Sequence, residues 1–211
     1  IAASVKETLE KKGIVFRMNA KVQSVKHVEN RAVVVFSDSQ TGEVFELEAD
    51  AVLLATGRKP NTKDLNLEVA GVETDAHGAI IVDEYLKTTN PNIRAVGDVK
   101  GGLQFTYISL DDYRIIREDL FGDKKRKTSD RNPVAYSVFI DPPLARIGLN
   151  EDEARKQNLD VIIKKLPVMA ISRAKTLGET DGLLKAVIDK NTGEIVGCML
   201  FAPDASEVIN I

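Results

Sequence analysis

Two short apolar segments, residues 50–57 and 92–98, constrain the fold of this chain most. The first ends in a glycine, and the second ends in Gly97 followed by Asp98. Short apolar runs of this kind are typical of strands buried on both faces, so we expect the first inside a parallel sheet and the second as another buried strand. Ligand sites in such sheets form at the carboxyl ends of the strands, which makes Asp98 the first candidate site residue.

The spacing of apolar residues elsewhere predicts a mixed series of helices and strands. Residues 1–9 show helical spacing, and Gly13 follows as a helix terminator before an apolar strand at residues 14–16. Another helix is expected from Asn150, with Glu153 completing its N-terminal capping pair. The remaining expected elements are a meander of strands at 21–28, 31–36 and 44–48, strands at 79–82, 134–140, 161–166, 183–189 and 194–201, a helix at 105–121 and a helix start at 203–207.

The composition is that of an ordinary globular protein with mixed surface charge. Of the 211 residues 43% are hydrophobic, and 29 basic residues stand against 32 acidic ones, which disfavours nucleic acid as a partner. The only clustered charge, at residues 124–127, is interpreted as a solvated linker rather than a basic recognition patch. No apolar run approaches the roughly 20 residues needed to cross a bilayer, so we expect a cytoplasmic protein with no membrane partner.

Cysteine and histidine are too sparse to build a reactive or metal-binding centre. The single cysteine, Cys198, lies in an apolar strand and is interpreted as a small buried hydrophobic residue. The two histidines, His27 and His77, have no second ligand at the spacing that zinc sites use. We therefore expect no disulfide and no metal site, and we assign no catalytic residue to this chain.

Several segments together resemble a known family. Residues 55–61 (ATGRKPN), followed by residues 95–98 (AVGD), resemble the class I pyridine nucleotide-disulfide oxidoreductases, the family of glutathione reductase, dihydrolipoamide dehydrogenase and mercuric reductase. Residues 138–149 (VFIDPPLARIGL) are similar to the opening of that family's dimerisation domain, and residues 182–210 to its later strands and helix. Residues 103–113 (LQFTYISLDDY) depart from the family's usual helix start and are similar to the branch that contains hypothiocyanous acid reductase.

The resemblance implies a fold that combines α/β and α+β parts. Partial NAD-binding and FAD-binding Rossmann-like domains would precede an incomplete α+β dimerisation domain. The expected boundaries give the NAD(P)-binding domain residues 1–58, the returning part of the FAD-binding domain residues 59–124, and the truncated dimerisation domain residues 125–211. The chain begins inside a helical pattern and stops at a helix start, so we expect a C-terminal fragment of a longer protein.

The resemblance also implies where a flavin would bind. The carboxylate of Asp98, next to Gly97, would accept hydrogen bonds from hydroxyls of the ribityl chain. Thr106, next to Phe105, begins the following helix, whose backbone amides and positive dipole end would face the pyrimidine side of the flavin. The alternatives are an aspartate that merely closes a strand or turn, and ordinary capping at Thr106.

Gly57 and Arg58 follow the first apolar segment, and the resemblance implies that they lie near the nicotinamide nucleotide. Arg58 could instead serve a structural ion pair. The implied cofactors of the parent enzyme are FAD and NAD(P)H, with hydride passing from NAD(P)H through FAD to a pair of cysteines. The implied partners are a second copy of the chain, bound through the C-terminal domain, and a small-molecule substrate, either a disulfide or a related small oxidant.

Three family features are absent from the sequence. It contains no pair of cysteines separated by four residues, no His-Pro-Thr-x-x-Glu run and no Gly-x-Gly-x-x-Gly turn. We therefore expect this chain by itself to be inactive and to lack high-affinity cofactor contacts. One alternative is a non-catalytic dimerisation module without bound cofactor, and another is a related flavin reductase that uses no disulfide, against which residues 138–149 argue.

Overall fold

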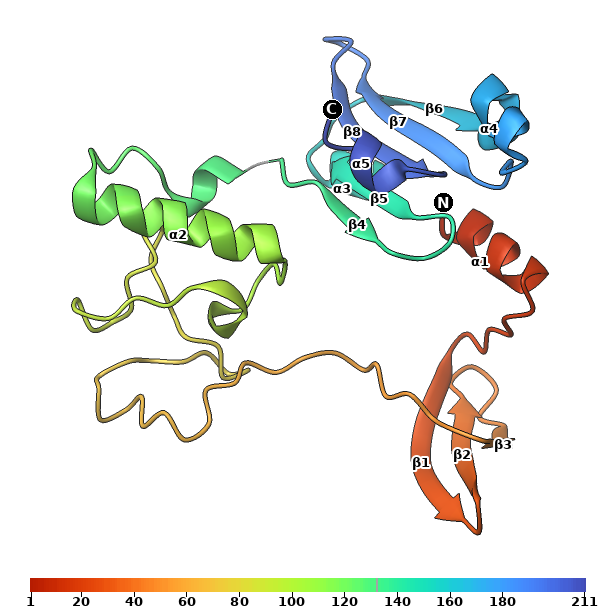
Figure 1. Ribbon diagram of the computed structural model, residues 1–211, viewed down its shortest axis with the longest axis horizontal. Coiled ribbons are helices and arrows are strands. Elements are labelled where there is room, and N and C mark those ends of the chain that lie inside the picture. The colour runs from red at the N-terminus through yellow and green to blue at the C-terminus, as the bar shows by residue number, and fades with distance from the viewer. Residues whose placement is uncertain (132) are drawn as a thin grey trace. The chain divides into compact units, whose positions relative to one another are not determined.

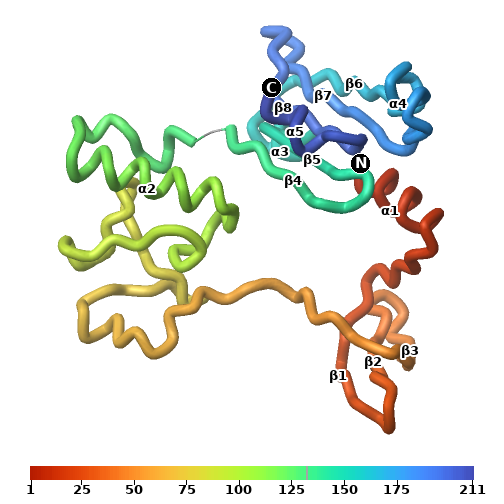
Figure 2. Tube along the Cα trace, viewed as in Figure 1, coloured from red at the N-terminus to blue at the C-terminus, as the bar shows by residue number. Residues whose placement is uncertain are grey.

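The structure is a computed structural model that describes residues 1–131 and 133–211. The chain divides into two compact units, which we describe separately. The first unit combines Ile1–Leu53 with Pro133–Ile211, and the second is Leu54–Asn132. Figure 1 shows the helices and strands of each unit, and Figure 2 follows the same chain from its N-terminus to its C-terminus.

The N-terminal part of the first unit is a helix followed by a three-stranded meander. Helix α1 (Ala2–Lys11) precedes strands β1 (Ala20–Val28), β2 (Arg31–Asp38) and β3 (Val44–Ala49). The strands pair antiparallel in the order β1-β2-β3, which confirms the predicted helix and meander (Figure 1). Phe36, on the central strand, is buried and stacks on the ring of its β3 neighbour.

The C-terminal part of the first unit is built on a five-stranded sheet with short helices. All neighbouring strands pair antiparallel, in the order β4-β5-β8-β7-β6. Helix α5 packs against β4 and β5, and helix α3 packs against β6. The elements are β4 (Tyr136–Val138), β5 (Leu144–Gly148), α3 (Glu151–Lys156), β6 (Val161–Pro167), η3 (Val168–Ala170), α4 (Ser172–Leu177), β7 (Leu183–Asp189), β8 (Ile195–Phe201) and α5 (Ala205–Val208).

Two local features shape the chain where β5 leads into α3. Gly197 lies so near β5's end that an added Cβ would meet the carbonyl oxygen of Leu149 at 1.8 Å, so only glycine fits there. Asn150 accepts a hydrogen bond from the backbone N–H of Glu153 at 2.8 Å, and the Glu153 carboxylate accepts one in return from the Asn150 N–H. This capping box begins α3 and confirms the sequence prediction.

The second unit has one long helix and little other regular structure. Helix α2 (Thr106–Phe121) follows the 3-10 turn η1 (Gly97–Lys100), and a second 3-10 turn, η2 (Thr128–Arg131), comes after it. Helix α2 confirms the helix predicted at residues 105–121 almost to its ends. The small apolar core of the loops before η1 contains Val72, Ile80 and Ala95.

Four predicted strands are wrong. Residues 50–57 form no strand, and Leu53 and Leu54 are 90% and 71% exposed. A strand buried on both faces must bind neighbours through its N–H and C=O groups, and no described residue of this chain offers it a partner strand. Residues 79–82 and 92–98 contribute only isolated bridges, at Ile80 and at Arg94. The segments expected as strands that form none are 14–16, 50–57, 79–82 and 92–98.

The mixed α/β class predicted from the sequence is confirmed, with two antiparallel sheets in the described residues. The sequence did not predict β5 or α4. Within residues 1–131 and 133–211, no helix is both long and apolar enough to cross a membrane.

Candidate functional site

The candidate site is the turn η1 and the start of α2, both in the second unit. Gly97 begins the turn with φ +68°, and Gly101 follows it with φ +71°, both in the left-handed region that favours glycine. The turn is closed by a hydrogen bond of 3.0 Å from the Gly101 N–H to the Asp98 carbonyl. It is also tied to the small core, because the Ile80 N–H donates to the Val99 carbonyl at 3.0 Å.

Asp98 presents its carboxylate from this turn toward solvent. Its side chain is 51% exposed, and its nearest cation is Arg58, whose guanidinium lies 3.5 Å from the carboxylate. Both partners are largely solvated, so the ion pair contributes little to stability. The structure thus brings together three of the residues singled out from the sequence: Arg58, Gly97 and Asp98. Gly57, the neighbour of Arg58, has φ +112° and open space where a Cβ would stand.

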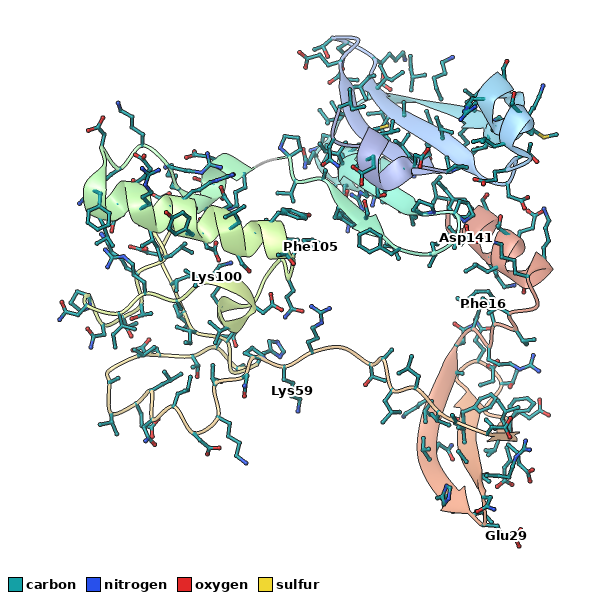
Figure 3. The ribbon with its side chains drawn as sticks, viewed as in Figure 1. Phe16, Glu29, Lys59, Lys100, Phe105 and Asp141 are labelled. Carbon is teal, nitrogen blue, oxygen red and sulfur yellow. The ribbon has the colours of Figure 1, made fainter. Side chains whose placement is uncertain are left out.

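Helix α2 begins at Thr106, with Phe105 in the N-cap position. Phe105 has extended backbone angles, and no side-chain hydrogen bond caps the helix within the described chain. Its ring stacks on that of Tyr107, with centroids 5.3 Å apart, and Figure 3 shows it where the helix starts. The helix is 16 residues long, so its N-terminus carries the full positive end of the macrodipole. This end favours negative charge on a ligand.

Three aspartates that the sequence reading missed are buried on α2: Asp111, Asp112 and Asp119. Burial alone would raise the pKa of Asp111, but hydrogen bonds from Arg126 and Arg131 outweigh it and hold that pKa below its ordinary value. Asp112 is fully buried and pairs with Arg131 and with Lys100 of the turn. A signal existed, because Asp112 and Asp119 lie seven residues apart, on the helix face that also buries Ile108 and Ile115.

The basic run at residues 124–127 folds back onto this unit. Arg126 pairs with Asp111, Lys127 pairs with Glu84 at 3.1 Å, and Lys124 lies 3.8 Å from Asp119. Most of the run is exposed to solvent, as its interpretation as a solvated linker predicts, but ion pairs also tie it to this unit. Three of its cations pair with carboxylates on α2 and on a loop before it, whereas Lys125 pairs with the neighbouring Asp123 at 2.8 Å.

The only cysteine of the chain belongs to the first unit, on β8. Cys198 is partly buried, and burial raises the pKa of its thiol above the ordinary value. A thiol with a raised pKa is mostly protonated and reacts slowly. Within the described residues no group of histidine, cysteine and carboxylate side chains is arranged to hold a metal ion.

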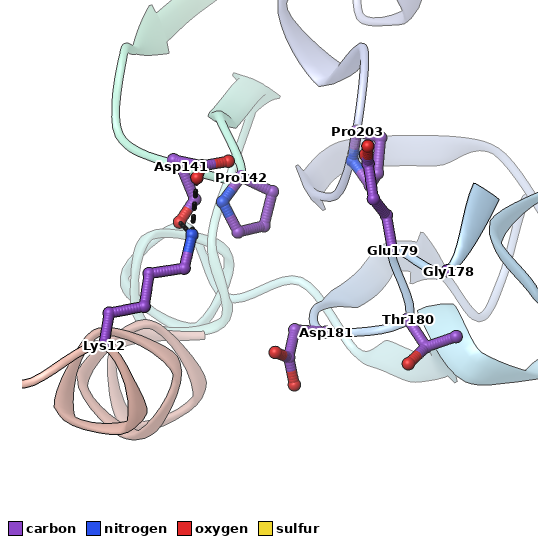
Figure 4. Close-up of a pocket in the computed structure, with 8 residues that line it drawn as sticks. All are labelled: Lys12, Asp141, Pro142, Gly178, Glu179, Thr180, Asp181 and Pro203. Atoms are coloured by element: carbon purple, nitrogen blue, oxygen red, sulfur yellow. Dashed lines mark hydrogen bonds and ion pairs between the residues drawn. The ribbon is translucent and has the colours of Figure 1, made fainter.

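Two pockets lie in the first unit. One, of 280 Å³, has Lys12 and Asp141 at its rim, where the lysine donates to the aspartate's carbonyl oxygen at 2.8 Å and contacts its carboxylate at 2.5 Å (Figure 4). Two further carboxylates line it, Glu179 and Asp181, and Asp181 pairs with Lys11 at 3.1 Å. The second pocket, of 530 Å³, is mostly apolar and is lined by α1 and by side chains of β4, β5 and β8.

Comparisons with known proteins cover the whole chain. A family model described as pyridine nucleotide-disulphide oxidoreductase matches residues 1–112, and the model of that family's dimerisation domain matches residues 134–211. The probable pyridine nucleotide-disulfide oxidoreductase RclA of Escherichia coli K12 is 46% identical over 211 residues, covering 100% of this chain and 46% of that protein. The mercuric reductase of Staphylococcus aureus is 35% identical over 209 residues, covering 99% of this chain and 38% of that protein.

Solved structures agree with these matches. The structure of the HOCl-induced flavoprotein disulfide reductase RclA from Escherichia coli superposes with a TM-score of 0.91 at 45% identity, covering 100% of this chain and 47% of that one. The dihydrolipoyl dehydrogenase of Geobacillus stearothermophilus is 34% identical in sequence over 209 residues, covering 99% of this chain and 44% of that protein. The chain thus spans less than half the length of each of these relatives.

Proposed function

We propose a function from the premise that this chain belongs to the pyridine nucleotide-disulphide oxidoreductase family. The full-length protein is an FAD-dependent oxidoreductase that takes hydride from NAD(P)H and passes electrons through FAD to a dithiol, and from there to a disulfide or a related small oxidant. The observation that carries this proposal is the half-exposed carboxylate of Asp98, held on a glycine-bounded turn that leads into the N-terminus of α2.

The residues present fit a flavin. A carboxylate only accepts hydrogen bonds, so Asp98 suits the hydroxyls of a ribityl chain. Gly102, which follows the turn, has open space where a Cβ would stand, so a ligand can approach the backbone there. The amide end of α2 at Thr106, preceded by Phe105, suits the electron-rich pyrimidine side of the ring. Bound FAD would supply the two-electron chemistry that the side chains of this chain lack.

Arg58 and Gly57 are assigned to the nicotinamide side of this site. The ion pair between Arg58 and Asp98 is long and solvated, so either group can turn to a ligand at little cost. The proposed domain limits remain residues 1–58 for the NAD(P)-binding part, 59–124 for the FAD-binding part and 125–211 for the dimerisation part. The match of the dimerisation model to residues 134–211 supports the last of these.

We assign no disulfide reduction to this chain by itself. Its sequence holds one cysteine, so the two thiols of a redox pair cannot both come from it. The raised pKa of Cys198 also disfavours a thiolate at that position. Residues 134–211 would pair with a second copy of the chain to form a homodimer, and this supports a second candidate function, a dimerisation module that acts without cofactor.

Flavin binding by the purified chain separates the two functions. The chain is mixed with FAD and passed over a size-exclusion column, and the visible absorbance of the protein peak is recorded. Co-eluting flavin that is lost in Asp98→Ala but kept in Asp123→Ala supports the oxidoreductase site, because Asp123 is a solvated carboxylate of the same unit, outside the turn. A colourless dimer supports the dimerisation module, and flavin that survives Asp98→Ala contradicts the role given to Asp98.

A further inference from the structure

One buried carboxylate holds both ends of the turn that presents Asp98. Asp112 Oδ2 accepts a hydrogen bond of 2.6 Å from the backbone N–H of Gly97, the first residue of η1. The same oxygen lies 3.5 Å from the ammonium group of Lys100, the last residue of η1. We propose that Asp112 is a positioning residue for the flavin-binding turn, an inference that rests on the proposed function.

The surroundings of Asp112 require a carboxylate rather than an apolar side chain. Asp112 is 0% exposed, and its other oxygen pairs with Arg131 of η2. The Lys100 side chain is itself only 8% exposed. Since buried polar groups are costly unless they are paired, an apolar residue here would leave the Gly97 N–H and two cations without their common acceptor.

The contacts of Asp112 with Gly97 and Lys100, which we call the tether, act on the backbone that carries Asp98. Asp98 follows Gly97 directly, and its side chain has no strong anchor of its own, since it is half-exposed and its pair with Arg58 is long. The position of its carboxylate is therefore set by the turn. Without the tether, the turn would have to be ordered when ligand binds, and that ordering would be subtracted from the affinity.

Asp111 provides a matched control on the same helix. It is buried to a similar degree and pairs with Arg126 and Arg131, both C-terminal to α2 and outside the turn. Replacing Asp111 removes a buried negative charge and its ion pairs with arginine, as replacing Asp112 does. The contact with Gly97 and Lys100 belongs to Asp112.

The test compares Asp112→Asn, Asp112→Leu and Asp111→Asn in the full-length protein. The dissociation constant for FAD is measured by titrating the flavin-free protein, together with its melting temperature and the hydrogen exchange of the Gly97–Gly101 amides. Because a charge-assisted hydrogen bond is lost, both Asp112 variants should bind FAD about tenfold or more weakly and exchange the turn amides faster, with Asp111→Asn within about threefold of the parent.

Asp112→Asn keeps the shape of the side chain and so keeps the test valid if Asp112→Leu does not fold. Suppose that Asp111→Asn and Asp112→Asn lose the same FAD affinity and the same melting temperature. Asp112 would then have a merely structural role, and the inference would be overturned. Unchanged FAD affinity in Asp112→Asn would also overturn it. If the protein without substitutions binds no FAD, the proposed function fails. Slow hydrogen exchange of its Gly97–Gly101 amides would then show that Asp112 holds the turn but positions no flavin.

Discussion

Asp119 offers the sharpest test of how the second unit is held together. Its carboxylate is 1% exposed and pairs with Arg94, while its Oδ1 atom lies 3.1 Å from the ammonium group of Lys87. The Arg94 Nε atom is buried and has no hydrogen-bond partner among the residues that the structure describes. Asp119→Asn keeps the volume of the side chain and removes its charge, so it isolates the ion pairs from the packing.

The magnitude follows from the burial of the three groups. Removing one partner of a fully buried ion pair costs about 3–5 kcal/mol, because the remaining charge is left uncompensated. Here the Arg94 and Lys87 side chains are 19% and 31% exposed, so water can partly solvate the cations that remain. Asparagine also keeps an acceptor oxygen for Arg94. We therefore expect Asp119→Asn to lower the free energy of unfolding of α2 by about 2 kcal/mol at neutral pH.

The lowered pKa of Asp119 predicts how the stability difference between the unsubstituted protein and Asp119→Asn changes with pH. The hydrogen bond from Arg94 is the largest cause that lowers the pKa of Asp119, it outweighs the opposing effect of burial, and Lys87 adds to it. A carboxyl whose pKa is lower in the folded state stabilises the fold at pH values above its unfolded pKa, which is about 4. That stability is lost as the pH falls through the lowered, folded-state value. The gap between parent and Asp119→Asn should therefore be full at pH 7 and should shrink only below about pH 4.

The assay must report on α2 alone, because a chain of two compact units does not guarantee a single two-state transition. Hydrogen exchange of α2 amides, measured by mass spectrometry across pH, gives this local free energy. Asp123→Asn is the control, since Asp123 pairs with Lys125 in solvent and should change nothing measurable. A loss below about 0.5 kcal/mol, or a gap that stays constant below pH 4, would refute the reasoning.

Three further substitutions or labelling experiments test other parts of the structure. Gly97→Ala places a Cβ at φ +68° and 3.0 Å from Ser109 Oγ, so it should destabilise the turn by about 1–2 kcal/mol in hydrogen-exchange measurements. Gly102→Ala should cost less, because its Cβ meets nothing within 4 Å, and equal effects of the two substitutions would show that the contact with Ser109 adds nothing. Asn150→Ala removes the capping box of α3 and should cost about 1 kcal/mol, seen as faster exchange in α3 alone. Cys198 should react slowly with a thiol reagent in the folded protein and fast after denaturation, because burial raises its pKa; fast reaction in the folded protein would contradict its assigned environment.

The sequence predicted the elements whose pattern is local. The meander, α2, the α3 capping box and the hairpin of β7 and β8 each carry their own periodicity or capping residues, and each is present. Residues 50–57 failed because an apolar run is compatible with a buried strand only when partner strands flank it, and the sequence of the run does not supply them. The strand predicted at 92–98 is reduced to one isolated bridge, between Lys87 and Arg94, and the positive φ of Gly97 then turns the chain into η1.

The candidate site was only half accessible to sequence reasoning. Asp98 and Thr106 could be named from motifs, and whether they bind flavin stays a prediction. Asp112 could not be named, because its role depends on Gly97 and Lys100, and on Arg131 nearly twenty residues further along the chain. A carboxylate on an apolar helix face was the available signal, and it gains meaning only with the partners that the fold supplies.

The two buried carboxylates on this face of α2 should have separable effects. An apolar face would pack α2 against the unit, but apolar contacts are not directional and fix no single position for a turn of glycines and polar groups. Asp112 ties the helix to η1, whereas Asp119 ties it to Arg94 and Lys87, which precede the turn. If each tether acts locally, Asp119→Asn lowers the stability of α2 with little change in FAD affinity, whereas Asp112→Asn lowers the affinity more than its stability loss accounts for. A flavin affinity that follows stability alone in both variants would mean that α2 acts as one packed body, and that neither carboxylate positions the turn.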